Sequence, residues 1–447
     1  MSSSESSFSG FEEDEVRDIE TRSIGSDFSV SSVATDDLSF SLSDLYNSSE
    51  PSDSDDSDNE VYDGDIVFSD ELRDITVKPF VPYPAQLQHN IDFATGREID
   101  YFKLFWNDDM IDNMVTQTNL YAEQLISESP DASWYETNKQ EMQAFIGLNI
   151  LQGIDPKPEL SMYWSKDKFF GNAGVQDTMS RDRYKDLSKY LHVNDNRTAV
   201  PQGAPGYDPL HKIAPTLYDL RSNLKKQFNP GCALAIDEAM VACKGRSYMK
   251  QYLPSKPTKW GFKIWSIADS VTGYLCDIDI YTGKRANPSK NGLGYDVVMK
   301  LGERYLGRYH HLYFDNLFSS LQLAQDLLKQ KTYCCSTIRP NRIGLPEEIK
   351  KPGTLGRGDS VKRQCGNITA TVWHDKRDVR LLASNSQPVD SVVQRRVGGK
   401  KKDVACPEVV MEYNKNMGGW IWLINTGHTM RSAGRQRNIG NLCYGFS

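Results

Sequence analysis

The stretch ALAIDEAM, residues 233–240, is apolar enough to form a buried central strand, yet it carries the carboxylate of Asp237 in its middle. Two further strand-like runs follow, FKIWSIAD at 262–269 and YLCDIDIY at 274–281, and Gly273 provides the turn between them. These three runs predict an antiparallel meander.

The pattern changes after this meander. Asp296 is placed to cap a helix over 297–306, a short strand HLYF follows at 311–314, and a further helix is expected over 321–330. Three antiparallel strands, a helix, a fourth strand and a helix are the order of the RNase H-like fold. In that fold the fourth strand lies parallel to the first. The sequence therefore predicts an α/β catalytic core of this type.

Asp237 requires a partner if its strand is central. An unpaired carboxylate inside a protein costs several kcal/mol, about the cost of breaking a buried ion pair. A divalent metal ion could supply the compensating charge, and so could Lys263 on the neighbouring strand. Both alternatives remain open at this point.

Asp315 follows the fourth strand directly, at a position that lies beside the middle of the first strand in this topology. It could instead cap the next helix, but Ser319 and Ser320 are better placed to do so. We therefore expect the carboxylates of Asp237 and Asp315 to converge to roughly 4 to 6 Å, a distance that one or two divalent ions can bridge. Two such carboxylates suit two-metal phosphoryl transfer with Mg²⁺.

Other titratable side chains are expected to be structural. Asp277 and Asp279 alternate with apolar residues and are predicted to lie on a solvent-facing side of their strand. His310 and His311 are adjacent in a strand, so they point to opposite faces and cannot chelate one ion together.

The N-terminal half divides into a tail and a helical region. Residues 1–77 are rich in Ser, Asp and Glu, and they are predicted to be disordered. Within 78–230, apolar spacing predicts helices over the following ranges: 98–126, 139–154, 181–193 and 213–228.

The charge of the chain is distributed unevenly. Residues 1–75 hold 22 Asp and Glu against three Arg, whereas the rest holds 49 Lys and Arg against 38 acids, a net charge of +11. A basic body favours a nucleic-acid partner, because Lys and Arg release counterions from phosphates.

No apolar run approaches the roughly 20 residues of a membrane span, and no P-loop or zinc-knuckle pattern occurs.

A basic segment follows the predicted core, and 334–405 is expected to form an inserted β-rich segment. Its cations could be solvated loop residues or phosphate contacts. The candidate DNA-binding residues are Lys256, Lys259, Arg339, Arg342, Arg395, Arg396, Lys400, Lys401 and Lys402.

The stretch DEAMVACKGRSYMKQYLPSKPTKWGFKIWSIADSVTGYLCDIDIYTGK, residues 237–284, closely resembles the signature of the piggyBac transposase family. Further matching elements are MYWSKD from Met162, YLHVND from Tyr190, YFDNLFSS from Tyr313, WHDKRDVRLLAS from Trp373 and MEYNKNMGG from Met411.

The resemblance implies an RNase H-like DDE/D catalytic domain with an insertion, preceded by a helical DNA-binding and dimerisation domain. It implies cut-and-paste transposition of double-stranded DNA at TTAA targets through hairpinned transposon ends, by a nuclear homodimer without membrane contact. By motif, the first two catalytic and metal-binding acids are Asp237 and Asp315, and the expected cofactor is Mg²⁺ or Mn²⁺.

The third acid of the family does not fall on an acid here. The family continues after Met-Gly-Gly with Val-Asp, whereas this chain reads WIWLIN from Trp420. Trp is encoded by TGG and Ile codons begin with AT, so a frame one base earlier across Trp420 and Ile421 gives GAT, which encodes Asp. We therefore expect the chain to have left its ancestral frame near Gly419, which would leave the transposase inactive and without the family's cysteine-rich C-terminal domain.

The remaining parts of the expected domain organisation are a catalytic core at 231–333, the start of the last segment of that core at 406–419, and an out-of-frame tail at 420–447. The main alternative function is a domesticated DNA-binding protein without catalysis. A weaker alternative is an active nuclease in which Asp375 or Asp378 replaces the missing acid.

Overall fold

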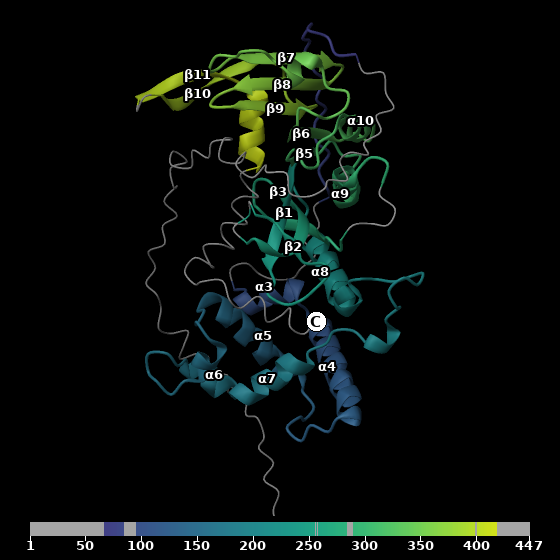
Figure 1. The fold of residues 1–447 in the computed structure, drawn as a ribbon, viewed down its shortest axis with the longest axis vertical. Helices are drawn as coiled ribbons and strands as arrows, with labels where there is room; N and C mark the ends of the chain where they lie inside the picture. The colour runs from purple at the N-terminus through teal and green to yellow at the C-terminus, as the bar shows by residue number, and fades with distance from the viewer. Residues whose placement is uncertain are drawn as a thin grey trace, which may run out of the picture.

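The computed structural model describes residues 67–84, 95–254, 256, 258–283, 289–397 and 400–417. The predicted disorder of residues 1–66 and the predicted out-of-frame tail at 420–447 lie outside these ranges. The described chain is a mixed α/β fold in which a helical region precedes one large sheet (Figure 1).

Within the described residues, the helical region is built from six α-helices joined by loops and short 3₁₀ turns. The sequence predicted one helical run over 98–126, but the run breaks at Trp106, because the Asn107 side chain accepts a hydrogen bond from the amide of Met110 and starts a new helix. None of the described helices is both long and apolar enough to cross a membrane. The helices are α3 (Glu98–Phe105), α4 (Asp108–Glu128), α5 (Lys139–Ile154), α6 (Ala173–Thr178), α7 (Arg181–Tyr190) and α8 (Ala214–Gln227).

The sheet is mixed, and its order is β2-β3-β1-β5-β6-β9-β8-β7, with β4 paired to β3. β1 is antiparallel to β3 and parallel to β5, with Ile236 opposite Phe314 in the last registered pair. The predicted meander and the predicted parallel fourth strand are therefore both present. These strands are β1 (Ala233–Ala242), β2 (Gln251–Tyr252), β3 (Trp260–Asp269), β4 (Leu275–Ile280) and β5 (His311–Phe314).

The segment predicted as a separate insertion largely continues this sheet. β6 lies parallel to β5, and β9, β8 and β7 extend the sheet from it. The predicted boundary at residue 334 is therefore wrong, since it cuts through a central strand. The sequence did not reveal β6 because Cys334, Cys335 and Ser336 are short residues with no alternating pattern. The strands are β6 (Tyr333–Thr337), β7 (Ser360–Cys365), β8 (Ile368–His374) and β9 (Asp378–Ala383).

Helices cover both faces of the sheet. One face packs against α9 (Leu293–Gly302), α10 (Leu321–Lys329) and α11 (Glu347–Lys350), and a helix over 408–417 packs against the other (Figure 1). Ser320 caps α10 by accepting a hydrogen bond from the amide of Leu323, as expected. Asp296 does not cap α9, which begins three residues earlier at Leu293, so that prediction is wrong.

Ion pairs to two buried acids of β4 attach α8 and α9 to the sheet. Asp277 of β4 accepts hydrogen bonds from Arg221 of α8 at 2.7 and 2.9 Å, and its carboxylate lies 2.7 Å from the ammonium of Lys225. Asp279 pairs with Lys300 at 2.8 Å. Both acids are buried, so the prediction of a solvent-facing side was wrong. Alternation in sequence could not reveal that α8 and α9 cover this strand.

The chain before the helical region lies along the sheet. Ile75 is buried and exchanges two backbone hydrogen bonds with the side chain of Gln387, and the amide of Lys78 donates to the Tyr333 hydroxyl. The hydroxyl of Tyr83 lies 3.1 Å from Nε2 of the buried His310. The prediction of disorder up to residue 77 is therefore wrong for residues 67–77.

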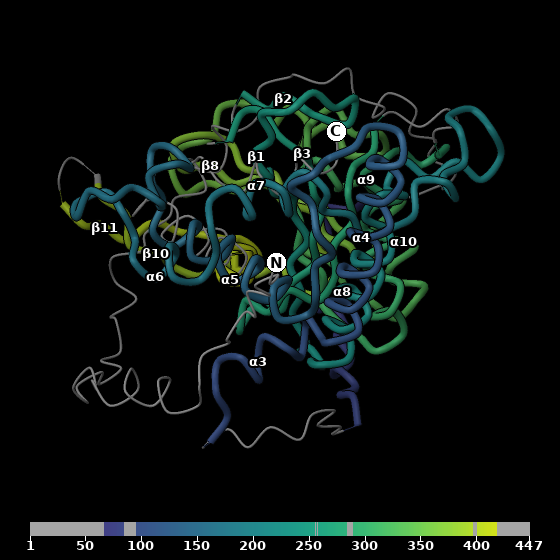
Figure 2. The backbone as a smooth tube through the Cα atoms, turned by 90° about the horizontal axis from the view of Figure 1, so that it is seen from below, coloured from purple at the N-terminus to yellow at the C-terminus, as the bar shows by residue number. Residues whose placement is uncertain are grey.

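The last two strands form a separate hairpin, β10 (Asp390–Val397) and β11 (Lys400–Pro407). Its base is attached to the sheet by the Trp373 indole, which donates a 2.8 Å hydrogen bond to the carbonyl of Ala405. Seen from below, the hairpin extends on the opposite side of the molecule from α9 and α10 (Figure 2).

Candidate active site

The register of β1 and β5 brings the two predicted acids together. Ile236 and Phe314 are registered neighbours on these parallel strands, and Asp237 and Asp315 are the next residue of each chain segment. Ala235 and Tyr313 belong to the core on the face of the sheet that the 408–417 helix covers. Since side chains alternate along a strand, Asp237 falls on this same face.

Asp237, Glu238 and Asp315 form one cluster of acids. Each offers a carboxylate oxygen, and these three atoms all lie within 4.8 Å of one another. The expected convergence of Asp237 and Asp315 is thus present, and Glu238 joins them. Carboxylate oxygens at this spacing are the ligands that hard divalent cations prefer.

Lys256 is the cation that lies among these acids. Its ammonium is 2.9 Å from one carboxylate oxygen of Glu238, and its side chain is 24% exposed. The other oxygen of Glu238 is buried and has no hydrogen-bond partner among the described residues. A buried carboxylate oxygen normally has a partner, so this atom fits a role as a ligand to a cation.

The electrostatics of the cluster favour an added positive charge. Burial and the neighbouring Glu238 hold the pKa of Asp237 well above its usual range. Burial and Glu238 also raise the pKa of Asp315 to about 6, although the Leu317 amide opposes this rise. Burial raises the pKa of Glu238, but Lys256 and Lys263 outweigh it and hold that pKa below its ordinary value.

Lys263, which the sequence offered as a partner of Asp237, therefore acts on Glu238 instead. Lys256 and Arg339 oppose the rise in the pKa of Asp315, yet that pKa and the pKa of Asp237 stay raised, so the residues present fit a divalent metal ion.

The loop after β5 is held in place by two arginines. Asp315 accepts a 2.8 Å hydrogen bond from the amide of Leu317. Arg339 donates to the side chain of Asn316 at 3.0 Å, and Arg342 donates to the carbonyls of Asn316 and Leu317. Arg342 is only 6% exposed, so its prediction as a surface contact for DNA is wrong.

A tyrosine from the 408–417 helix, Tyr413, packs in one core with Ala235 and Tyr313, which precede the two acids by two residues each. Burial raises the pKa of Tyr413, and the nearby charges of Asp315 and Asp237 raise it further. The helix that ends the described chain therefore packs beside the acid cluster.

The other predicted DNA contacts fall into two groups. Lys256 belongs to the acid cluster, and Arg395 lies 3.3 Å from Asp375. The remaining candidates are exposed: Lys259, Arg396, Lys400, Lys401 and Lys402.

The hairpin gathers most of these exposed cations. Arg395 is opposite Lys402 and Arg396 is opposite Lys401 in the register of β10 and β11. We call these four residues with Lys400 the basic hairpin.

The two acids suggested as replacements for the third ligand have other partners. Asp375 pairs with Arg357 and Arg395, and Asp378 pairs with His374 and Arg380. Neither joins the cluster of acids in the described chain. Sequence reasoning missed Glu238 because residues next to each other in a strand normally point to opposite faces.

Comparison with known proteins agrees with this geometry. The family model described as "Transposase IS4" matches residues 97–437. The human PiggyBac transposable element-derived protein 3 is 28% identical over 362 residues, which are 77% of this chain and 58% of the relative. The human PiggyBac transposable element-derived protein 5 is 27% identical over 335 residues, which are 70% of this chain and 61% of the relative. The chain thus spans somewhat more than half the length of these curated relatives.

A solved structure is similar as well. A piggyBac transposase, determined by cryo-EM as a synaptic complex with hairpin DNA, matches with a TM-score of 0.62 and 28% identity, over 77% of this chain and 71% of that one. The matched family model covers most of the chain and includes all three clustered acids. The chain therefore belongs to the piggyBac-type transposases, within the family that the transposase IS4 model describes.

Proposed function

We propose that this chain is a DNA transposase by descent, with an RNase H-like DDE/D catalytic core centred on Asp237 and Asp315. The observation that carries the proposal is the convergence of these acids at neighbouring positions of two parallel strands. The similarity to a piggyBac transposase bound to hairpin DNA supports double-stranded DNA as the substrate. Cut-and-paste transposition at TTAA targets, a homodimer and a nuclear location are parts of the same proposal.

Family membership implies divalent metal use, and we propose Asp237 and Asp315 as ligands for Mg²⁺ or Mn²⁺. When bound, such ions activate an attacking water or hydroxyl and stabilise the leaving oxygen of a phosphodiester. Lys256 keeps Glu238 ionised, and the Leu317 amide orients Asp315. The raised pKa of Asp315 supports this role, because a cation would take the place of its proton.

We propose further that catalysis requires an acid from the segment after the 408–417 helix and that the chain as written lacks it. The packing of Tyr413 in one core with Ala235 and Tyr313, each two residues before one of the acids, supports that location. The family match continues to residue 437, so the proposed frame change rests on the codons of Trp420 and Ile421 rather than on an end of the similarity. Sequencing the transcript across Gly419 tests it.

A second candidate function is supported by Glu238. Its unpartnered oxygen belongs to a carboxylate that approaches the other two acids to within 4.8 Å, so Glu238 could complete the site. The chain would then be an active metal-dependent nuclease. The domesticated DNA-binding protein without catalysis remains the alternative in which the basic hairpin alone is functional.

One cleavage experiment separates these proposals. A family-like transposon end with Mg²⁺ or Mn²⁺ would be incubated with the chain as written, with a frame-restored chain, and with Glu238→Gln and Asp237→Asn variants of both. We expect cleavage by the restored chain only, and its loss in Asp237→Asn. Cleavage by the chain as written that Glu238→Gln abolishes would establish the second candidate instead. No cleavage by either chain, with DNA binding retained, would favour the domesticated alternative.

A further inference from the structure

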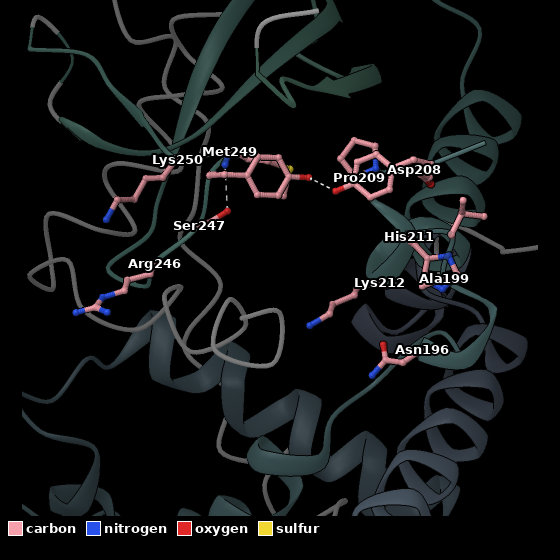
Figure 3. Close-up of a pocket in the computed structure, with 13 residues that line it drawn as sticks. Asn196, Ala199, Asp208, Pro209, His211, Lys212, Arg246, Ser247, Met249 and Lys250 are labelled. Carbon is pink, nitrogen blue, oxygen red and sulfur yellow. Dashed lines mark hydrogen bonds between the residues drawn. The ribbon is translucent and has the colours of Figure 1, made fainter. Parts of the chain in front are cut away.

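A cavity of about 890 Å³ lies between the helical region and the loop that follows β1 (Figure 3). One wall comes from the connection between α7 and α8 and includes Asn196 and Lys212. The opposite wall comes from the loop after β1 and includes Arg246 and Lys250. Pockets of about 300 to 1,000 Å³ suit a small molecule or one unit of a polymer.

Both walls of this cavity are fixed by hydrogen bonds. On the first wall, a ring nitrogen of His211 lies 3.0 Å from the Asp195 carbonyl, and the Asn194 side chain donates to the His211 carbonyl at 2.7 Å. On the second wall, the Lys250 ammonium donates to the Gly245 carbonyl at 3.0 Å and lies 5.3 Å from the centre of the Trp260 ring. The cavity is therefore a formed feature of the fold.

Two tyrosines join the walls. The hydroxyls of Tyr207 and Tyr248 are 2.9 Å apart and share a hydrogen bond, although the residues are 41 positions apart in sequence. Tyr248 is nevertheless 59% exposed. An aromatic ring held by its hydroxyl and otherwise open is suited to stacking on another flat group.

The charge of the lining is mainly positive. Within the described chain, neither Lys212 nor Arg246 has a hydrogen bond or an ion pair from its side chain, and both lie in the lining. Asp208 is the single acid among the described lining residues, and its side chain accepts a hydrogen bond from the Leu210 amide. Figure 3 shows Lys212 extending into the space between the walls. Free cations beside an open aromatic ring are the features that bind an unpaired nucleic-acid strand.

We propose that this cavity binds one nucleotide of an unpaired DNA strand, with its base stacked on Tyr248 and its phosphates near Lys212 and Arg246. The inference rests on the proposed function as a DNA transposase and adds a substrate subsite to it. The loop begins one residue after β1 ends at Ala242, about 17 Å along the strand from Asp237 at roughly 3.3 Å per residue. The loop that forms one wall of the cavity thus continues directly from the strand that carries Asp237.

The test measures binding of a fluorescent ten-nucleotide oligothymidine and of a duplex to the full chain without added metal. Tyr248→Ala should weaken binding of the single strand by about fivefold or more, because stacking contributes about 1 to 3 kcal/mol per base. Tyr248→Phe keeps the ring but removes its hydrogen bond to Tyr207, so it should weaken binding of the single strand less than Tyr248→Ala does. Tyr218→Ala is the matched control, since Tyr218 is an exposed tyrosine on α8 outside the cavity. Thermal unfolding of each variant establishes that it is folded.

The outcomes separate the subsite from the wider function. Selective loss of single-strand binding in Tyr248→Ala, with duplex binding unchanged, supports the subsite. Equal single-strand affinity in Tyr248→Ala and Tyr218→Ala would overturn it, as would an equal loss for both forms of DNA. Normal single-strand binding at the cavity without any duplex binding would reject the proposed duplex substrate and keep the subsite.

Discussion

Two groups of acids in the same sheet, one buried and one partly buried, have opposite electrostatics. Asp277 on β4 accepts two hydrogen bonds from Arg221 and pairs with Lys225, and these interactions outweigh burial and hold its pKa below the ordinary value. Asp237 and Asp315 share their surroundings with Glu238, and their pKa values are raised. Burial of a carboxylate therefore does not identify a site. The balance of charge around it does: the first group is complete, and the second lacks positive charge.

The largest change in stability is expected when the carboxylate of Asp277 is removed from its ion pairs. Asp277→Asn leaves Arg221 and Lys225 without their carboxylate, and removing one partner of a buried ion pair costs about 3 to 5 kcal/mol. The two cations are 27% and 30% exposed, so water offsets part of this cost, and we expect a decrease in unfolding free energy of about 2 to 3 kcal/mol. Urea unfolding at pH 7 measures it.

The pH dependence of this effect has a definite sign. Because the folded pKa of Asp277 is lowered, its contribution is present above the ordinary Asp pKa of about 4 and is lost as the pH falls through the lower folded pKa. A destabilisation by Asp277→Asn that is equally large at pH 7 and about pH 2.5 would contradict the assignment.

The opposite change in stability is expected in the cluster of Asp237, Glu238 and Asp315. Asp237→Asn removes a partly buried acid from beside Glu238 and Asp315 while keeping its shape. In the presence of a chelator we expect an increase in unfolding free energy of about 1 kcal/mol, because like charges and desolvation penalise the native cluster. A destabilisation of more than about 1 kcal/mol would mean that Asp237 has an ordinary structural role.

Metal affinity should depend on pH in this group. Asp315 must release its proton to bind a cation, and its pKa is raised to about 6. Asp237 must also release its proton, and its pKa is held well above its usual range, so we expect Mn²⁺ affinity to fall as the pH is lowered, by at least about tenfold per pH unit below about 6. Calorimetry at several pH values checks this expectation, and an affinity that is unchanged between about pH 5 and pH 7.5 would refute it.

The smallest effect per substituted residue is expected for DNA binding by the basic hairpin. Reversing the charge of Arg396 and Lys401 should weaken duplex binding and lower the slope of log affinity against log salt by about one for each phosphate that is no longer neutralised. Lys185→Glu on α7 is the matched control, because Lys185 is an exposed lysine outside the hairpin. If the double variant and the control bind duplex DNA equally, the basic hairpin does not bind DNA.

The strands that carry both groups of acids could be predicted from the sequence, whereas their ionic partners could not. The strand runs, the parallel pairing of β5 with β1 and the approach of Asp315 to Asp237 follow from local pattern and from the order of the elements. The pairing of Asp277 with Arg221 was not predictable, because it depends on how α8 packs over β4.

Glu238 and Lys256 were missed for a related reason. Alternation along β1 predicts that Glu238 points away from Asp237, and Lys256 was expected to contact DNA. Only the folded chain places the Lys256 ammonium 2.9 Å from Glu238. Local pattern therefore predicted the strands that carry the site, whereas the neutralising partners depend on tertiary packing.

The most direct measurement of the central claim is Mn²⁺ binding to matched asparagine variants. The full chain, Asp237→Asn, Asp315→Asn and Asp277→Asn would be titrated with Mn²⁺ at about pH 7.5, where Asp315 is ionised, and the free ion would be followed by electron paramagnetic resonance. We predict that the first two variants lose the tight site and that Asp277→Asn, while less stable, keeps it. Binding by Asp237→Asn that equals that of the unaltered chain would contradict the assignment of this cluster as the metal centre.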